Sequence, residues 1–136
     1  THGGMNVSII RQSHAKKTIK TSLVDDDSKF AMYQSMRQTI ENGHRILVVY
    51  PLVNESKAMD AQTVEQGYHA WGTMFGNKVG MVHGKMSQEQ KAQAIRSMRD
   101  GETQVLITSS VVEVGLDIPD IKEMLIVRPQ RYGMNQ

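Results

Sequence analysis

Apolar residues along the chain fall into two patterns, short continuous runs and repeats at helical spacing. The runs are rich in β-branched residues and predict buried strands over residues 19–24, 45–50, 78–82, 104–107 and 122–127. The helical repeats predict helices over residues 29–42, 57–75 and 87–100. Because strands and helices alternate, we expect an α/β fold. Its sheet would be mostly parallel, with right-handed crossovers and helices on both faces.

Each predicted helix has one apolar face that should be buried. The core positions expected from this spacing are Phe30, Tyr33, Met36 and Ile40, then Val64, Tyr68, Trp71 and Phe75, then Ala92, Ile95 and Met98. Tyr68 and Trp71 could instead stack on nucleic-acid bases, but their helical register favours packing in the core. Gly67 and Gly72 each weaken the second helix by about 1 kcal/mol relative to alanine.

The ends of the predicted helices carry capping signals. Ser87 and Gln90 have the spacing of a capping box, and Gly101 is placed to end the same helix. The adjacent carboxylates of Asp25–Asp27 suit the amino end of the first helix. They also suit a cation, but metal sites usually take ligands from more than one segment, so capping is the favoured interpretation.

The stretch Val105–Pro119, with the sequence VLITSSVVEVGLDIP, passes from a predicted strand into polar residues. Ser109 and Ser110 follow the apolar run, and Gly115 and Asp117 lie further along. Open α/β sheets bind ligands outside the carboxyl ends of their strands, where hydroxyls and backbone N–H groups can contact phosphate oxygens. A nucleotide or nucleic-acid site is one interpretation. A capped turn in which one of the two serines begins a short helix is the other, and the residues alone fit both.

The same stretch resembles motif V of superfamily 2 helicases. Residues 82–91, VHGKMSQEQK, are similar to the HG-x-M segment of the same helicase domain. Residues 51–56, PLVNES, make the RecG family of branched-DNA translocases a better match than the related transcription-repair coupling translocases. The resemblance runs from about Ile19 to Gln136. It implies a RecA-like three-layer domain, the second of two that face each other, after a basic arm or linker over residues 1–18.

The resemblance also implies a role for each matched residue. Gly115 and Asp117 would bind the nucleotide, with Glu113 bracing the motif V loop. The implied DNA-binding residues are Pro51, Leu52, His83, Gly84, Lys85, Ser109 and Ser110. DNA would be held through its phosphates, without sequence specificity. No histidine, cysteine or carboxylate is spaced to share a metal with His83. For His83 the resemblance implies a positioning role near the nucleic acid. For Lys85 a solvated loop charge is the alternative.

The chain has no P-loop. The nearest approach, GMVHGKM over residues 80–86, is one residue short in its glycine spacing and ends in Met86 instead of the Ser or Thr that binds magnesium. The resemblance implies an ATP-dependent DNA helicase of recombination and repair, a hydrolase acting on branched or forked DNA. ATP and Mg²⁺ would bind mainly to a first RecA-like domain outside this sequence.

Motif VI would begin just after Gln136. It carries an arginine finger, a group worth about 10³–10⁵-fold in rate in related phosphoryl transfer. Because the P-loop is missing as well, we expect that the chain alone does not hydrolyse ATP.

Composition and charge add little to this picture. The net charge is +2. The first twenty positions hold four basic residues and no acidic residue; the basic ones are Arg11, Lys16, Lys17 and Lys20. This arm could meet phosphates or be a solvated linker. The chain has no cysteine, which excludes disulfides and thiolate metal sites. It shows no secretory signal and no apolar run of membrane-spanning length, so a cytoplasmic protein with no membrane partner is expected.

Two other functions stay open from the residues alone. One is a non-catalytic α/β nucleic-acid-binding module that derives from a helicase and has lost the motor. The other is a flavodoxin-like regulator, which would need an acidic cluster at its strand ends. Asp25–Asp27 imitates such a cluster poorly.

Overall fold

The computed structural model describes residues 19–51, 57–110 and 121–128. Most predicted elements are confirmed nearly to the residue, except that residues 26–32 form a 3₁₀ helix instead of the start of an α-helix. The elements are β1 (Lys20–Asp25), η1 (Asp26–Met32), α2 (Tyr33–Glu41), β2 (Arg45–Val49), α3 (Lys57–Phe75), η2 (Gly76–Lys78), β3 (Val79–Val82), α4 (Gln88–Asp100), β4 (Val105–Thr108) and β5 (Ile121–Arg128).

All described strands are parallel and form one sheet in the order β1-β5-β2-β4-β3. Val49 of β2 and Val82 of β3 both pair with Thr108 of β4, so these three strands end in one row. The backbone N–H of Tyr50 extends the ladder by donating to the carbonyl of Thr108 at 2.8 Å. The residues that follow β2, β3 and β4 therefore leave the sheet at the same edge.

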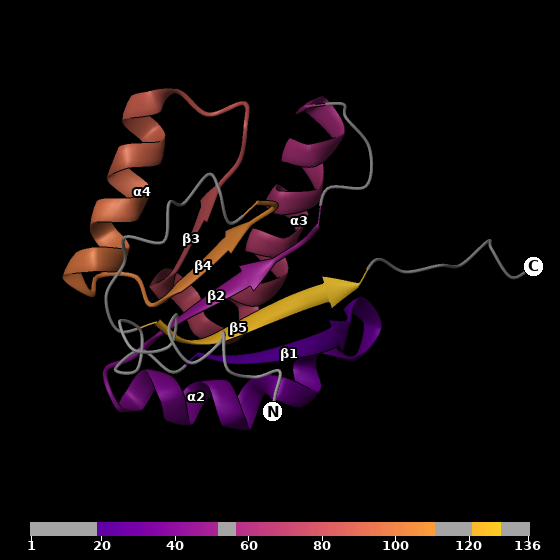
Figure 1. Cartoon of the computed structure of the whole chain (residues 1–136), viewed down its shortest axis with the longest axis vertical. Coiled ribbons are helices and arrows are strands. Elements are labelled where there is room, and N and C mark those ends of the chain that lie inside the picture. Colours follow the sequence, from indigo (N-terminus) through magenta and orange to yellow (C-terminus); the bar gives the residue numbers. More distant parts are fainter. Residues whose placement is uncertain (1–18, 52–56, 111–120, 129–136) are drawn as a thin grey trace, which may run out of the picture.

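Helices cover both faces of the sheet, as the α/β prediction required. Alternate residues of β2 serve different layers, because side chains in a strand point to opposite faces. Ile46 and Val48 pack in a cluster with residues of α2 and α3, while Leu47 and Val49 pack with Met98 of α4. Figure 1 shows α2 lying along the β1 side of the sheet, with α3 and α4 flanking β3 and β4. The structure is thus the expected RecA-like three-layer arrangement.

Two predicted core positions are wrong. Phe30 is 52% exposed, because the backbone kinks at Ser28 inside η1 and the 3₁₀ turns take Phe30 out of register with the buried Met36. Ala92 is exposed, because the buried stripe of α4 runs through Ile95 and Met98. At 100° per residue, Ala92 lies about 120° around the helix from Met98.

The amino-terminal side of the sheet is tied to the end of α4 by Arg45. Its Nε donates to the carbonyl of Met98 at 2.7 Å and its Nη2 to the carbonyl of Arg99 at 3.0 Å. These carbonyls belong to the last turn of α4, where the N–H of Gly101 also donates to the carbonyl of Met98, at 3.3 Å. Gly101 ends the helix with φ 87°. The guanidinium therefore adds a charged donor to these carbonyls at the negative end of the helix dipole.

Candidate nucleic-acid interface

The end of β3 is organised by His83, which is 4% exposed. The N–H of Met86 donates to the carbonyl oxygen of His83 at 3.2 Å, closing a turn over Gly84 and Lys85. The N–H of Lys85 donates to Nδ1 of the imidazole at 3.2 Å, and the N–H of His83 donates to the sulfur of Met86 at 3.4 Å. Three polar groups of one buried residue thus hold the turn. Lys85 itself is exposed, and Gly84 is half-buried.

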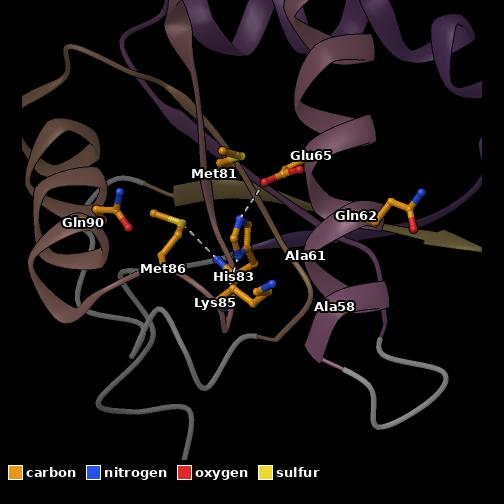
Figure 2. Close-up of a pocket in the computed structure, with 9 residues that line it drawn as sticks. All are labelled: Ala58, Ala61, Gln62, Glu65, Met81, His83, Lys85, Met86 and Gln90. Atoms are coloured by element: carbon orange, nitrogen blue, oxygen red, sulfur yellow. Dashed lines mark hydrogen bonds and ion pairs between the residues drawn. The ribbon is translucent and has the colours of Figure 1, made fainter.

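The fourth polar group of His83 reaches α3. Nε2 of the ring lies 3.4 Å from Oε2 of Glu65, a carboxylate whose side chain is 52% exposed. Figure 2 shows the imidazole between this carboxylate and Lys85, with the dashed lines running to Glu65 and Met86. The sequence did not predict Glu65, because the pair joins residues of two different elements and no periodicity within α3 marks it.

The turn leads directly into the cap of α4. The N–H of Gln90 donates to Oγ of Ser87 at 3.1 Å, and the N–H of Ser87 donates to Oε1 of Gln90 at 2.9 Å. The capping box predicted from the sequence is therefore confirmed. The positive end of the α4 dipole and the exposed ammonium of Lys85 lie close together in the chain, and both favour an anion such as phosphate.

A hollow of about 370 Å³ separates the amino-terminal turns of α3 from the turn after β3. Its wall on α3 is formed by Ala58, Ala61, Gln62 and Glu65. The opposite side carries His83 and Lys85 (Figure 2). Met81 and Met86 line the hollow as well, so its wall mixes polar and apolar side chains, and it lies at the edge strand β3.

The end of β4 is held by a hydroxyl. Oγ1 of the fully buried Thr108 accepts from the N–H of Ser110 and donates to the carbonyl of Ser110, both at 3.3 Å. Ser109 between them is 6% exposed, and Ser110 is half-buried. Of the two serines carried over from motif V, Ser110 thus presents more surface. Thr108 was not proposed as a site residue, and its role in fixing this turn follows only from the geometry.

The end of β2 is fixed by a buried aromatic pair. Nε1 of Trp71 donates to the hydroxyl of Tyr50 at 3.0 Å, and burial raises the pKa of Tyr50 to about 12. Trp71 is fully buried, which confirms packing in the core over stacking on bases. A Cβ on Gly67 would lie 2.6 Å from Cε1 of Tyr50, so glycine permits this approach. Pro51, which follows Tyr50, is exposed at the sheet edge.

The predicted DNA-binding segments after β2, β3 and β4 thus come to the same edge of the sheet. Four predicted site residues lie outside the described residues: Leu52, Glu113, Gly115 and Asp117. Within the ranges that the structure describes, no group of three or more His, Cys, Asp or Glu side chains could hold a metal ion. Among the same residues, none of the helices combines the length and apolar character needed to cross a membrane.

Comparison with known proteins supports the expected family. The sequence matches the family described as helicase conserved C-terminal domain over residues 28–135. It is 30% identical over 138 aligned residues to the ATP-dependent DNA helicase RecG of Thermotoga maritima. The identity is 33% over 136 residues to the RecG of Staphylococcus epidermidis and 31% over 137 residues to that of Bacillus subtilis.

These alignments take in 99%, 98% and 98% of this chain but 18%, 20% and 20% of the three relatives. The chain therefore spans about a fifth of the length of the curated relatives it matches. The match also agrees with the layered parallel sheet and with the motifs over residues 51–56, 82–91 and 105–119. The chain belongs to the family of helicase conserved C-terminal domains.

Proposed function

We propose that this chain is the second motor domain of an ATP-dependent DNA helicase or translocase that acts on branched or forked DNA in recombination and repair. The relatives named ATP-dependent DNA helicase RecG and the family match support this proposal. The observation that carries it is the common edge reached by Pro51, the His83–Lys85 segment and the Ser109–Ser110 segment. Segments far apart in the sequence can meet one nucleic-acid backbone there.

The DNA contacts we propose are contacts to phosphates. The exposed ammonium of Lys85 and the half-buried Ser110 offer donors at one edge of the sheet. Such groups position a nucleic-acid backbone without reading its bases. Ser109 is 6% exposed, so of the two serines it has less surface open to a phosphate.

Nucleotide binding is proposed for the other end of motif V. Gly115 and Asp117 would bind ATP on the side that faces a first RecA-like domain, and Glu113 would brace the loop. This chain has no P-loop, so the phosphates and Mg²⁺ would be held mainly by that first domain. The nucleotide supplies the energy when bound, and opening and closing between the two domains would move the DNA held at this edge. We place this activity in the cytoplasm.

A non-catalytic nucleic-acid-binding module is the second candidate, and the RecG relatives do not favour it. ATP hydrolysis by the full-length protein, with forked DNA and with unforked duplex of the same length, separates the two. A DNA-coupled motor should be stimulated more by the fork, and the present chain alone should show no turnover. Hydrolysis that is absent under both conditions would favour the binding module.

A further inference from the structure

We propose that Glu65 of α3 is a positioning residue for the DNA-binding turn after β3, acting through the imidazole of His83. The inference rests on the proposed function and extends it to a residue outside the helicase motifs. The chain of contacts is short: Oε2 of Glu65 lies 3.4 Å from Nε2 of His83, and Nδ1 of the same ring accepts from the N–H of Lys85. The carboxylate thus connects α3 to the backbone of the proposed DNA contact.

The hydrogen bond from Lys85 determines which ring nitrogen of His83 carries the proton. The N–H of Lys85 can donate only to a nitrogen that carries no proton, so Nδ1 of His83 is the bare nitrogen. In the neutral ring the proton then lies on Nε2. The ring is 4% exposed, so an N–H there needs an acceptor inside the protein. The carboxylate of Glu65 lies at ion-pair distance from this atom, 3.4 Å, which is longer than an ordinary N–H···O hydrogen bond, and it is the group we infer to favour this tautomer (Figure 2).

With the proton on Nδ1 instead, two N–H groups would face each other, one from the ring and one from the backbone of Lys85. The turn would lose a hydrogen bond and would have to rearrange next to Ser87, which caps α4. The tautomer therefore decides whether the turn presents Gly84 and Lys85 in the described conformation. A buried imidazole whose other nitrogen is set by a carboxylate is a known device for fixing a tautomer.

The negative charge of Glu65 and its contact with His83 predict opposite changes in DNA affinity when the carboxylate is removed. A carboxylate beside a DNA contact repels phosphates, so removal of its charge should by itself strengthen DNA binding. If Glu65 holds the turn, loss of its acceptor should weaken DNA binding instead. Glu65→Gln removes the charge but keeps a carbonyl oxygen that can accept from Nε2. Glu65→Ala removes both the charge and the acceptor.

The experiment compares full-length wild-type protein with Glu65→Ala, Glu65→Gln and Gln66→Ala. Gln66 is the next residue of α3 and is exposed, so its variant is a matched control for substitution on this helix. Hydrogen–deuterium exchange of the peptide over residues 83–87 reports on the turn without DNA. We expect exchange about fivefold faster in Glu65→Ala, as for loss of one hydrogen bond, and wild-type exchange in Glu65→Gln and Gln66→Ala.

The second readout is the DNA concentration that half-saturates ATP hydrolysis. It should rise about fivefold in Glu65→Ala at an unchanged maximal rate, and should stay level or fall in Glu65→Gln. Wild-type behaviour of Glu65→Ala in either readout would overturn the proposal. A Glu65→Gln variant as impaired as Glu65→Ala would overturn it too, because a retained acceptor would then not preserve the turn. If the wild type shows no DNA-stimulated hydrolysis, the proposed function fails, while the exchange data still decide whether Glu65 holds the turn.

Discussion

The indole nitrogen of Trp71 donates a 3.0 Å hydrogen bond to the hydroxyl of Tyr50. Trp71 lies on α3, and Tyr50 is the residue that follows β2, directly before the exposed Pro51. Both side chains are buried, so neither polar atom can turn to water instead. The bond therefore fixes the point from which the chain leaves β2 toward the proposed DNA contacts.

Tyr50→Phe should destabilise the domain by about 1–3 kcal/mol, because it leaves the buried N–H of Trp71 without its acceptor. Chemical denaturation of the full-length protein, followed by far-ultraviolet circular dichroism, measures the change. A double variant with Trp71→Phe separates the hydrogen bond from the loss of packing. An unchanged denaturation midpoint in Tyr50→Phe would mean that the bond adds nothing to stability.

Alkaline pH should weaken the fold through the same tyrosine. Burial raises the pKa of Tyr50 to about 12, whereas an unfolded tyrosine titrates near about 10. Below pH 10 both states keep the proton and the contribution of Tyr50 is fully present. Between about pH 10 and 12 the unfolded state loses its proton first, so stability falls as pH rises. Denaturation midpoints measured over this range should fall less steeply in Tyr50→Phe than in the wild type.

Two glycines of α3 should respond in opposite ways to alanine. In Gly67→Ala the new Cβ would lie 2.6 Å from the ring of Tyr50, so the ring or the helix must shift and the variant should be less stable. Gly72 has open space at this position, and Gly72→Ala should gain up to about 1 kcal/mol from helix propensity. Melting temperatures of the two variants test this contrast, and a rise in both would contradict the close approach of Tyr50.

Arg45→Met should destabilise the domain by about 1–3 kcal/mol, because the last carbonyls of α4 lose their charged donor. The matched control is Arg37→Met. Arg37 is exposed and pairs with the exposed Glu41 at 3.0 Å, and pairs of this kind contribute little. Thermal unfolding should therefore separate the two substitutions clearly. Equal losses would show that Arg45 acts only as a surface charge.

Lys85→Ala should weaken DNA binding about equally for all sequences, because the proposed contact is to phosphate. The slope of log affinity against log salt should become shallower by about 1. Lys78→Ala is the control, because this substitution removes the same charge. Lys78 is exposed at the opposite end of β3. Fluorescence anisotropy with the full-length protein and forked DNA measures both. Equal effects of the two variants would point to net charge and not to a contact at this edge.

Periodicity predicted the layers of the fold well, because burial repeats within each element. Trp71 lies in the core as its helical spacing required, and Ser87 caps α4 as its spacing from Gln90 required. The errors at Phe30 and Ala92 have a local origin. At Phe30 the helix has 3₁₀ instead of α geometry, which changes the side chains that face inward. At Ala92 the buried stripe of α4 runs through Ile95 and Met98 instead.

The contacts that shape the site were harder to predict. The pairs of Glu65 with His83 and of Gly67 with Tyr50 depend on how α3 is seated against β2 and β3, and no spacing within one segment encodes that. The HG-x-M and motif V resemblances pointed to segments that the structure brings to one edge of the sheet, but they name only residues within the motifs. The nucleotide-binding roles of Gly115 and Asp117 stay predictions.

The order of the sheet has a consequence for synthesis of the protein. β1 is an edge strand whose neighbour is β5, and Lys20 pairs with Glu123 across almost the whole described chain. Closing such a long loop is entropically costly, and contacts of this separation slow folding. On the ribosome, β1 emerges first but must wait for β5 before it can join the sheet. During translation its backbone groups and Val24, which is buried in the folded sheet, are therefore open to chaperones and to neighbouring chains until β5 appears.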